Sequence, residues 1–261
     1  MTHDSICAAL GNHPWSKGLI VLDAVDSTNT YLKNLARQGA AHGTTVIAGS
    51  QTNGRGRRGR SFSSPAGKGL YLSVLWRVNA DPAQLMHLTC MAAEAARRAI
   101  EKSCGIECQI KWINDLVAEG KKLCGILTEL VTTPQGLAIV CGIGINCTQR
   151  MEDFPPEVAP MATSLAQLGA PASRSTLAAA LMEQLALAFD ALLTPQTWMA
   201  SYRRHCLTLG QDVQLLQNDQ LRLAHVNGMN DQGALLVTLA DGTQETIFSG
   251  EASVRGMYGY L

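Results

Sequence analysis

Short apolar runs separated by polar turns dominate the first third of the chain. The run GLIVLDAV at residues 18–25 predicts a buried strand, and the DSTN cluster that follows at 26–29 is typical of a helix cap. Apolar residues at helical spacing then predict a helix that stops at Gly39. Two further strands are predicted over residues 44–48 and 70–78.

The middle of the chain predicts one long helix and then a series of strands. Asp81 and Pro82 suit the first turn of a helix, and apolar residues recur at helical spacing from Leu85 until Gly105. Strands are predicted over 107–113, 116–118, 122–130 and 137–145, with a tight turn at 119–121. Links this short favour antiparallel hairpins.

The carboxy-terminal part changes character twice. A proline-rich segment at 153–160 predicts a loop, and helices are predicted from Ser175 and again after Thr194 and Pro195. From Val213 onward, short apolar runs alternate with turn sequences. The pattern therefore predicts an α+β fold, with a mixed, largely antiparallel sheet and packed helices over residues 1–208 and a small β domain over 209–261.

Composition narrows the class of protein. Hydrophobic residues make up 46% of the chain and charged residues 16%, as in folded soluble domains. The 21 basic and 21 acidic residues cancel, so no overall field attracts nucleic acid. No signal-peptide pattern is present, and no apolar run approaches the ~20 residues of a membrane span. We expect a cytoplasmic protein with no nucleic-acid or membrane partner.

The eight cysteines are mostly embedded in apolar stretches. Without a secretory signal they are expected to be reduced thiols. The pairs Cys104/Cys108 and Cys141/Cys147 lack the spacing of a zinc site, so small buried residues are the favoured interpretation.

The segment GRGRRGR at residues 54–60 places four arginines among three glycines. Glycine lets the backbone approach a ligand closely, and arginine matches carboxylate or phosphate oxygens two at a time, so an anionic ligand is expected. The segment also satisfies G-x-G-x-x-G, but no helix opens after it, which disfavours a dinucleotide site. The Walker and kinase motifs are absent, and no aromatic residues lie between the arginines to stack bases.

Two further motifs carry polar groups in apolar surroundings. KWINDLVAEGKKLCG at 111–125 brackets an Asn–Asp pair with lysines, and a hairpin with polar ends explains it equally well. In GIGIN at 142–146 alternate glycines remove the side chains from one strand face. Such glycines accommodate either a close neighbour or a ligand.

Together, four motifs in order and at matching spacings resemble the biotin protein ligases. They are DSTN at 26–29, Gln51 with GRGRRGR at 51–60, KWIND with KKLCGIL at 111–127, and GIGIN at 142–146. The resemblance covers roughly residues 18–261. It implies a biotin/lipoate ligase-type catalytic domain and a small SH3-like β-barrel. The chain is similar to the short form, which lacks a DNA-binding domain, because the 25 residues before Asp26 are too few for a helix-turn-helix repressor domain.

The resemblance implies a two-step reaction. Biotin and Mg-ATP give biotinyl-5'-AMP and pyrophosphate, and the biotinyl group then passes to one lysine of a biotin carboxyl carrier protein, such as that of acetyl-CoA carboxylase. Because a carboxylate must approach a phosphate, cations are needed to offset the repulsion. The GRGRRGR segment is expected to close over the adenylate and exclude water. We expect a monomer or a weak homodimer.

The resemblance also assigns residues to roles. Catalysis is expected from Lys122, Arg57 and Arg55. Biotin binding is expected from Ser27, Thr28, Asn29, Gln51, Gly54, Arg55, Gly56, Arg57, Lys122 and Gly125. ATP binding is expected from Arg55, Arg57, Arg58, Lys111, Asn114, Lys122 and Asn146. Mg²⁺ prefers few hard oxygen ligands besides the phosphates, and Asp115 and Asn146 are the expected ones.

One residue departs from the family pattern, and two alternatives remain. The family reads KWPND, whereas Ile113 stands in place of the proline, so the φ angle that proline fixes is lost. Lipoate or octanoate ligases and transferases use an acid without a ureido ring, and the polar set of Ser27, Thr28 and Gln51 favours biotin over these acids. A catalytically silent biotin-binding module is the second alternative.

Overall fold

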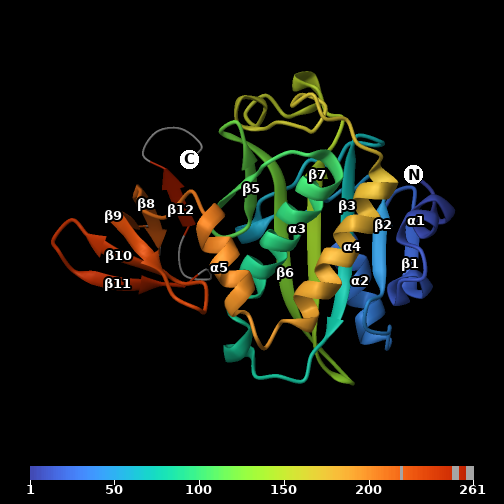
Figure 1. Ribbon diagram of the computed structural model, residues 1–261, viewed down its shortest axis with the longest axis horizontal. Coiled ribbons are helices and arrows are strands. Elements are labelled where there is room, and N and C mark those ends of the chain that lie inside the picture. Colours follow the sequence, from blue (N-terminus) through green and yellow to red (C-terminus); the bar gives the residue numbers. More distant parts are fainter. Residues whose placement is uncertain (218–219, 249–252, 257–261) are drawn as a thin grey trace.

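The larger part of the molecule is a seven-stranded sheet with helices on both faces (Figure 1). The computed structural model describes residues 1–217, 220–248 and 253–256. The sheet has the order β1-β2-β3-β7-β6-β5-β4, in which β1 and β2 run parallel and every other pair is antiparallel. Its strands are β1 Leu19–Leu22, β2 Thr45–Ala48, β3 Gly69–Arg77, β4 Gln109–Lys111, β5 Asp115–Ala118, β6 Lys121–Thr133 and β7 Gly136–Asn146.

The helices divide unequally between the two faces of this sheet. They are α1 His3–Leu10, α2 Thr28–Arg37, α3 Leu88–Cys104, α4 Arg174–Asp190 and α5 Gln196–His205. Helices α3 and α4 pack on each other over the larger core, to which β3 contributes Leu70, Leu72 and Val74. Helix α2 covers the opposite face through a small cluster that includes Leu32 and Leu75. Since successive strand residues alternate between faces, β3 is buried on both.

Local sequence signals explain where several elements begin and end. Ser27 caps α2 by accepting from the Thr30 amide at 3.5 Å. Gly105 ends α3 in the left-handed conformation, at φ 66°. Glu119 and Gly120 have φ values of 49° and 73° and form the tight turn predicted between β5 and β6. The predicted strands all form, with shifted ends, and antiparallel hairpins join β5 to β6 and β6 to β7.

The structure corrects four details of the helix and loop predictions. Asp81 caps only a 3₁₀ turn, η3 Pro82–Leu85, and α3 begins later, at Leu88. Helix α4 begins at Arg174 with Ser173 as its cap, because the Ser173 hydroxyl accepts from the Thr176 amide. The proline-rich segment carries two 3₁₀ turns, η4 Met151–Asp153 and η5 Ala159–Met161. Helix α1 was not predicted, although Thr2 and Ser5 form a capping box at its start.

A second, five-stranded antiparallel sheet forms the predicted small β domain (Figure 1). Its order is β11-β10-β9-β8-β12, with β8 Asp212–Gln217, β9 Gln220–Met229, β10 Leu235–Leu239, β11 Gln244–Ile247 and β12 Ser253–Gly256. Within the described residues, no ladder closes β11 onto β12 to complete the expected barrel. The sheet is fixed to the larger part because the Trp112 indole donates to the Gly233 carbonyl at 2.8 Å, and Arg203 pairs with Asp231.

The cysteine and membrane predictions were also examined in the structure. All eight cysteines are free thiols, and Cys7 and Cys104 alone are only half-buried. Burial raises the pKa of the Cys124 and Cys141 thiols well above the usual range. In the part of the chain that is described, no group of three or more potential ligand side chains is arranged to hold a metal. No helix within residues 1–217, 220–248 and 253–256 has the length and apolar character to cross a membrane.

Candidate active site

A cavity of about 700 Å³ lies on the α2 face of the sheet, along β6 and β7. It is bordered by the GRGRRGR segment, the KWIND segment and the proline-rich loop, and Gln214 and Val254 of the second sheet also line it. The predicted site residues in its lining are Ser27, Thr28, Asn29, Gln51, Arg55, Gly56, Arg57, Arg58, Lys111, Asn114, Asp115, Lys122, Gly125 and Asn146. Gly54 is the one predicted residue outside the lining. A Cβ there would lie 2.3 Å from the Phe62 carbonyl oxygen, so this glycine permits a close backbone contact.

The amino-terminal turn of α2 forms a neutral polar end of the cavity. The backbone amide and the hydroxyl of Thr28 lie 2.9 and 3.1 Å from Gln51 Oε1. Gln51 Nε2 in turn donates to Ser64 Oγ at 2.8 Å. These contacts fix the amide plane of Gln51, because its oxygen faces Thr28 and its nitrogen faces Ser64.

Glu129 lies behind this polar end and binds three side chains. It accepts from Lys33 Nζ and Asn29 Nδ2 at 2.8 Å each, and Arg55 NH1 is 3.6 Å away. Burial alone would raise the pKa of Glu129, but the hydrogen bonds from Lys33 and Asn29 and the charge of Arg55 outweigh it and lower the pKa. Glu129 is therefore an anion at neutral pH.

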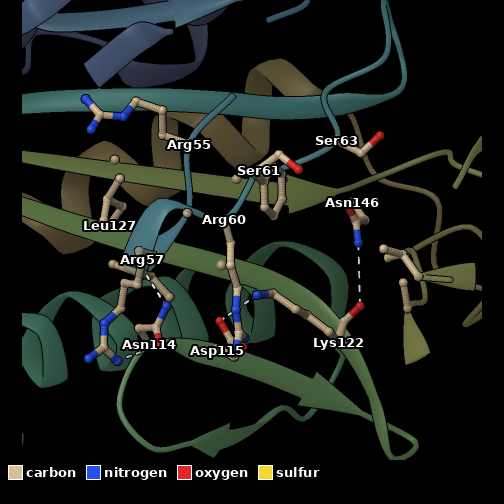
Figure 2. Close-up of a pocket in the computed structure, with 18 of the residues that line it drawn as sticks. Arg55, Arg57, Arg60, Ser61, Ser63, Asn114, Asp115, Lys122, Leu127 and Asn146 are labelled. Atoms are coloured by element: carbon tan, nitrogen blue, oxygen red, sulfur yellow. Dashed lines mark hydrogen bonds and ion pairs between the residues drawn. The ribbon is translucent and has the colours of Figure 1, made fainter. Parts of the chain in front are cut away.

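The GRGRRGR segment is a short hairpin whose arginines diverge. Gly56 donates to the Arg60 carbonyl at 2.7 Å, and Arg58 turns the chain at φ 56°. The Arg57 guanidinium donates to Asn114 at 3.2 Å, and Arg58 reaches the Leu216 carbonyl of the second sheet at 3.4 Å. Figure 2 shows Arg55 directed away from Arg57, and Arg55 faces Glu129 instead. Arg55, Arg57 and Arg58 thus do not point to one common anion site.

The aromatic ring of Phe62 lines the cavity next to Gly125 and Gly144. A Cβ on Gly144 would lie 2.4 Å from the Phe62 ring, and one on Gly125 would lie 3.2 Å from it. A Cβ on Gly142 would lie 2.0 Å from Asn29 Oδ1. The alternate glycines of GIGIN therefore make room for Phe62 and Asn29, which is the close-neighbour interpretation of that motif.

The opposite end of the cavity is charged. Lys122 Nζ pairs with Asp115 Oδ1 at 2.7 Å, and Figure 2 shows both side chains meeting below the GRGRRGR segment. Burial lowers the pKa of Arg57, and the charge of Asp115 opposes this effect. Cationic groups so placed suit a ligand with a carboxylate or a phosphate.

Asn146, a predicted metal ligand, has both ends of its amide hydrogen-bonded within the protein. Its Nδ2 donates to the Thr163 carbonyl at 2.9 Å. It also donates to the Lys122 carbonyl at 3.5 Å (Figure 2). Its Oδ1 accepts from Gln149 at 3.2 Å. Of the two predicted ligands, Asp115 offers a carboxylate in the cavity, which fits a Mg²⁺ held mainly by the phosphates of a nucleotide.

Sequence reasoning missed several residues that shape this site. Phe62, Ser73 and Glu129 were not singled out, and neither was Gln214 from the second sheet. The glycine alternation in GIGIN was the available signal for Phe62, since a missing side chain implies a neighbour that fills the space. No local pattern marks Ser73, which occupies an ordinary strand position.

Comparison with family models places two known domains on the chain. Residues 21–146 match the biotin/lipoate A/B protein ligase family, and residues 208–255 match the biotin protein ligase C-terminal domain. The first match includes the polar end, the GRGRRGR segment and the Lys122–Asp115 pair. The second covers most of the five-stranded sheet.

Curated relatives and solved structures give the same picture. The bifunctional ligase/repressor BirA of Escherichia coli is 36% identical over 90% of this chain and 73% of its own length. The biotin–acetyl-CoA-carboxylase ligase of Mycobacterium tuberculosis is 35% identical over 86% of this chain and 85% of its own. The BirA of Bacillus spizizenii is 41% identical, but the match covers only 46% of that protein. A biotin protein ligase of Aquifex aeolicus, solved with biotin and ATP, superposes with a TM-score of 0.78 at 30% identity, covering 92% of this chain and 99% of its own.

Proposed function

We infer that this chain, which belongs to the biotin protein ligase family, is an ATP-dependent ligase that activates biotin and transfers it to a lysine of a carrier protein. The observation that carries the proposal is that the two ends of the cavity differ in character along β6: one end is charged and the other is polar but uncharged. The charged end lies at Lys122 and the uncharged end near Leu127, and five residues of extended strand between them span about 16 Å. A ligand with a polar ring at one end and a carboxylate at the other matches this order.

Biotin is such a ligand. We place its ureido ring against Ser27, Thr28 and Gln51, with Asn29 behind them, and its bicyclic body beside Phe62. Its carboxylate then points toward Lys122 and Arg57. Gly125 supports this placement, since a Cβ there would lie 3.2 Å from Lys122 Nζ and narrow the passage.

In the first step, a biotin carboxylate oxygen attacks the α-phosphorus of ATP. The bond to the bridging oxygen breaks, and pyrophosphate leaves with its electron pair. Lys122 and Arg57 would stabilise the charge that develops on the α-phosphate, and Arg58, Lys111 and Asn114 would bind the remaining phosphates. Asp115 pairs with Lys122 in the cavity, and its carboxylate would help to hold the Mg²⁺ that accompanies ATP.

In the second step, the neutral amine of the carrier lysine attacks the carbonyl carbon of biotinyl-5'-AMP. The amide bond forms, and AMP leaves as the proton is lost from the nitrogen. The hairpin at 54–62 borders the cavity, and we propose that it screens the adenylate from water until the carrier arrives. The expected carrier is a biotin carboxyl carrier domain, the expected compartment is the cytoplasm, and a monomer or weak homodimer is the expected state.

One assay tests this function. The protein is incubated with Mg-ATP, radiolabelled biotin or radiolabelled lipoate, and a biotin carboxyl carrier domain. Label is expected on the carrier lysine with biotin, and none is expected when that lysine is changed to arginine. Label with lipoate alone would indicate the related lipoate activity, and biotin binding without transfer would indicate a silent binding module.

A further inference from the structure

A row of polar side chains, buried at its three middle members, runs from Glu129 to Gln51 beneath the neutral end of the cavity. Asn29 Nδ2 donates to Glu129 Oε2 at 2.8 Å. Ser73 Oγ lies 2.6 Å from Asn29 Oδ1 and 2.7 Å from Thr28 Oγ1. Thr28 Oγ1 lies 3.1 Å from Gln51 Oε1, which closes the row. Ser73 has no exposed surface, and Thr28 and Asn29 are each 4% exposed.

The charge at one end gives the row a direction. A carboxylate only accepts hydrogen bonds, so Asn29 must direct its nitrogen at Glu129 and its oxygen at Ser73. The Leu127 carbonyl, 3.2 Å from Asn29 Nδ2, requires the same orientation. Gly142 makes it possible, since a Cβ there would lie 2.0 Å from Asn29 Oδ1.

The hydroxyls of Ser73 and Thr28 then have fewer hydrogens than contacts. Two hydrogens serve three close oxygen pairs, and the outer oxygens, on Asn29 and Gln51, are acceptors only. If Ser73 donates to Thr28, its 2.6 Å contact with Asn29 has no hydrogen. If Ser73 donates to Asn29, Thr28 can donate to Ser73, and the long contact to Gln51 loses its hydrogen instead. In this second arrangement both lone pairs of Thr28 are available to a ligand, whereas in the first arrangement one of them accepts from Ser73.

We propose that Ser73 and Glu129 are positioning residues that make the Thr28 hydroxyl an acceptor for a ring N–H group of the ligand. The proposal rests on the proposed function, since biotin carries two such groups in its ureido ring. A ligand N–H that donates to Thr28 selects the arrangement in which every hydrogen bond runs toward Glu129. Aligned bonds of this kind reinforce one another in a buried site. A ring without N–H groups, such as the dithiolane of lipoate, leaves Thr28 without that donor and is discriminated against.

We call the hydrogen-bonded row from Glu129 through Asn29 and Ser73 to Thr28 the relay. A double-mutant cycle tests it, with biotin affinity measured by calorimetry in the absence of ATP. Ser73→Ala is expected to weaken biotin binding about tenfold when Thr28 is present, the loss typical of one buried hydrogen bond. In a Thr28→Val background the same change is expected to have less than a twofold effect, because the group through which it acts is gone. An equal loss in both backgrounds would overturn the proposal and indicate a general structural role.

The controls distinguish a loss of the relay from a general loss of stability and from a failure of the proposed function. Thr45→Val removes a buried hydroxyl next to β3 and is expected to leave biotin affinity unchanged. Desthiobiotin, which keeps the ureido ring, should lose affinity in parallel with biotin. If Ser73→Ala does not fold, Glu129→Gln is tested instead, in the wild-type and Thr28→Val backgrounds. Any effect that Glu129→Gln has through Arg55 is the same in both backgrounds and cancels in the comparison. If the wild-type protein binds no biotin, the proposed function itself is contradicted. If it binds biotin but Ser73→Ala weakens binding equally with and without Thr28, only the relay is contradicted.

Discussion

Lys122 is the residue on which the proposed chemistry of this site depends most directly. It is the second residue of β6, and its ammonium group pairs with Asp115 at 2.7 Å inside the cavity. Gly125 leaves the space that its side chain occupies. A fixed cation at this place stabilises charge on a phosphate without reorganising during the reaction.

Replacement of Lys122 by alanine is expected to lower the rate of adenylate formation by about 10²- to 10³-fold, the usual effect of removing one preorganised charge stabiliser. Pyrophosphate release from biotin and ATP measures this rate. The matched control is Lys121→Ala, because Lys121 is adjacent in sequence but does not line the cavity. A loss smaller than tenfold would mean that Lys122 is not the main cation.

Glu129 makes the free energy of unfolding depend on pH. Its pKa is lower in the folded state than in the unfolded chain, so the stabilisation from its charge is complete above the unfolded pKa of about 4.3 and is lost as pH falls through the folded value. The difference in unfolding free energy between wild type and Glu129→Gln should therefore be largest near neutral pH and shrink toward pH 3. Urea unfolding at several pH values measures it.

The exposed Glu152, whose side chain is 71% accessible, provides the control. Glu152→Gln should give a difference near zero at every pH, because surface pairs contribute little. If the difference in unfolding free energy between wild type and Glu129→Gln stays constant between pH 7 and pH 3, the charge of Glu129 does not stabilise the fold.

At the scale of elements, the GRGRRGR hairpin connects three parts of the molecule. Arg55 faces Glu129 on β6, Arg57 bonds Asn114 beside β5, and Arg58 reaches β8 of the second sheet. Most of these contacts involve partly exposed side chains or longer distances, so the hairpin is held by several weak interactions. Such a segment can change position when a ligand supplies stronger ones.

We expect biotin and ATP together to slow tryptic cleavage of this hairpin at least fivefold, since the adenylate would bind its arginines and the cavity would close over it. Limited proteolysis followed by mass spectrometry measures cleavage after Arg55, Arg57, Arg58 and Arg60. Cleavage after the exposed and distant Lys17 is the internal control. Equal protection at Lys17 would indicate a global stabilisation and would contradict a local closure.

At the scale of the whole molecule, the second sheet is part of the site. Gln214 and Val254 line the cavity, while the 230–233 turn is fixed to the larger part by Trp112 and Arg203. Trp112 belongs to the KWIND segment that also carries Asn114. The position of the second sheet and the position of this segment are therefore set by the same contacts.

Arg203→Ala is expected to raise the KM for ATP several-fold and leave the affinity for biotin unchanged, because only the side of the cavity next to the second sheet moves. Hydrogen exchange in β9 and β10 should become about fivefold faster, as expected when contacts worth about 1 kcal/mol are lost. Arg204→Ala is the matched control, because Arg204 follows Arg203 directly in sequence and its side chain is exposed. Equal effects from the two variants would show that Arg203 does not fix the sheet.

The sequence by itself determined the element pattern and the α+β class, and its four motifs supplied the predicted site residues, all of which line the cavity except Gly54. The elements follow from local signals, namely alternation and helical spacing, whereas the site residues follow from the resemblance of motifs such as DSTN and GRGRRGR to those of the biotin protein ligases. The same local reasoning misplaced the start of α3 and missed α1, where capping signals compete with weak apolar patterns.

Only the tertiary structure decided what each site residue contacts. The arginines of GRGRRGR look equivalent along the chain, yet Arg55 faces Glu129, 74 positions away, while Arg57 faces Asn114. The glycines of GIGIN were open to two interpretations until the packing of α2 and of the loop before β3 brought Asn29 and Phe62 against them. The physical reason is that burial patterns repeat over a few residues, whereas charge pairing and side-chain clearance depend on which distant strands lie side by side.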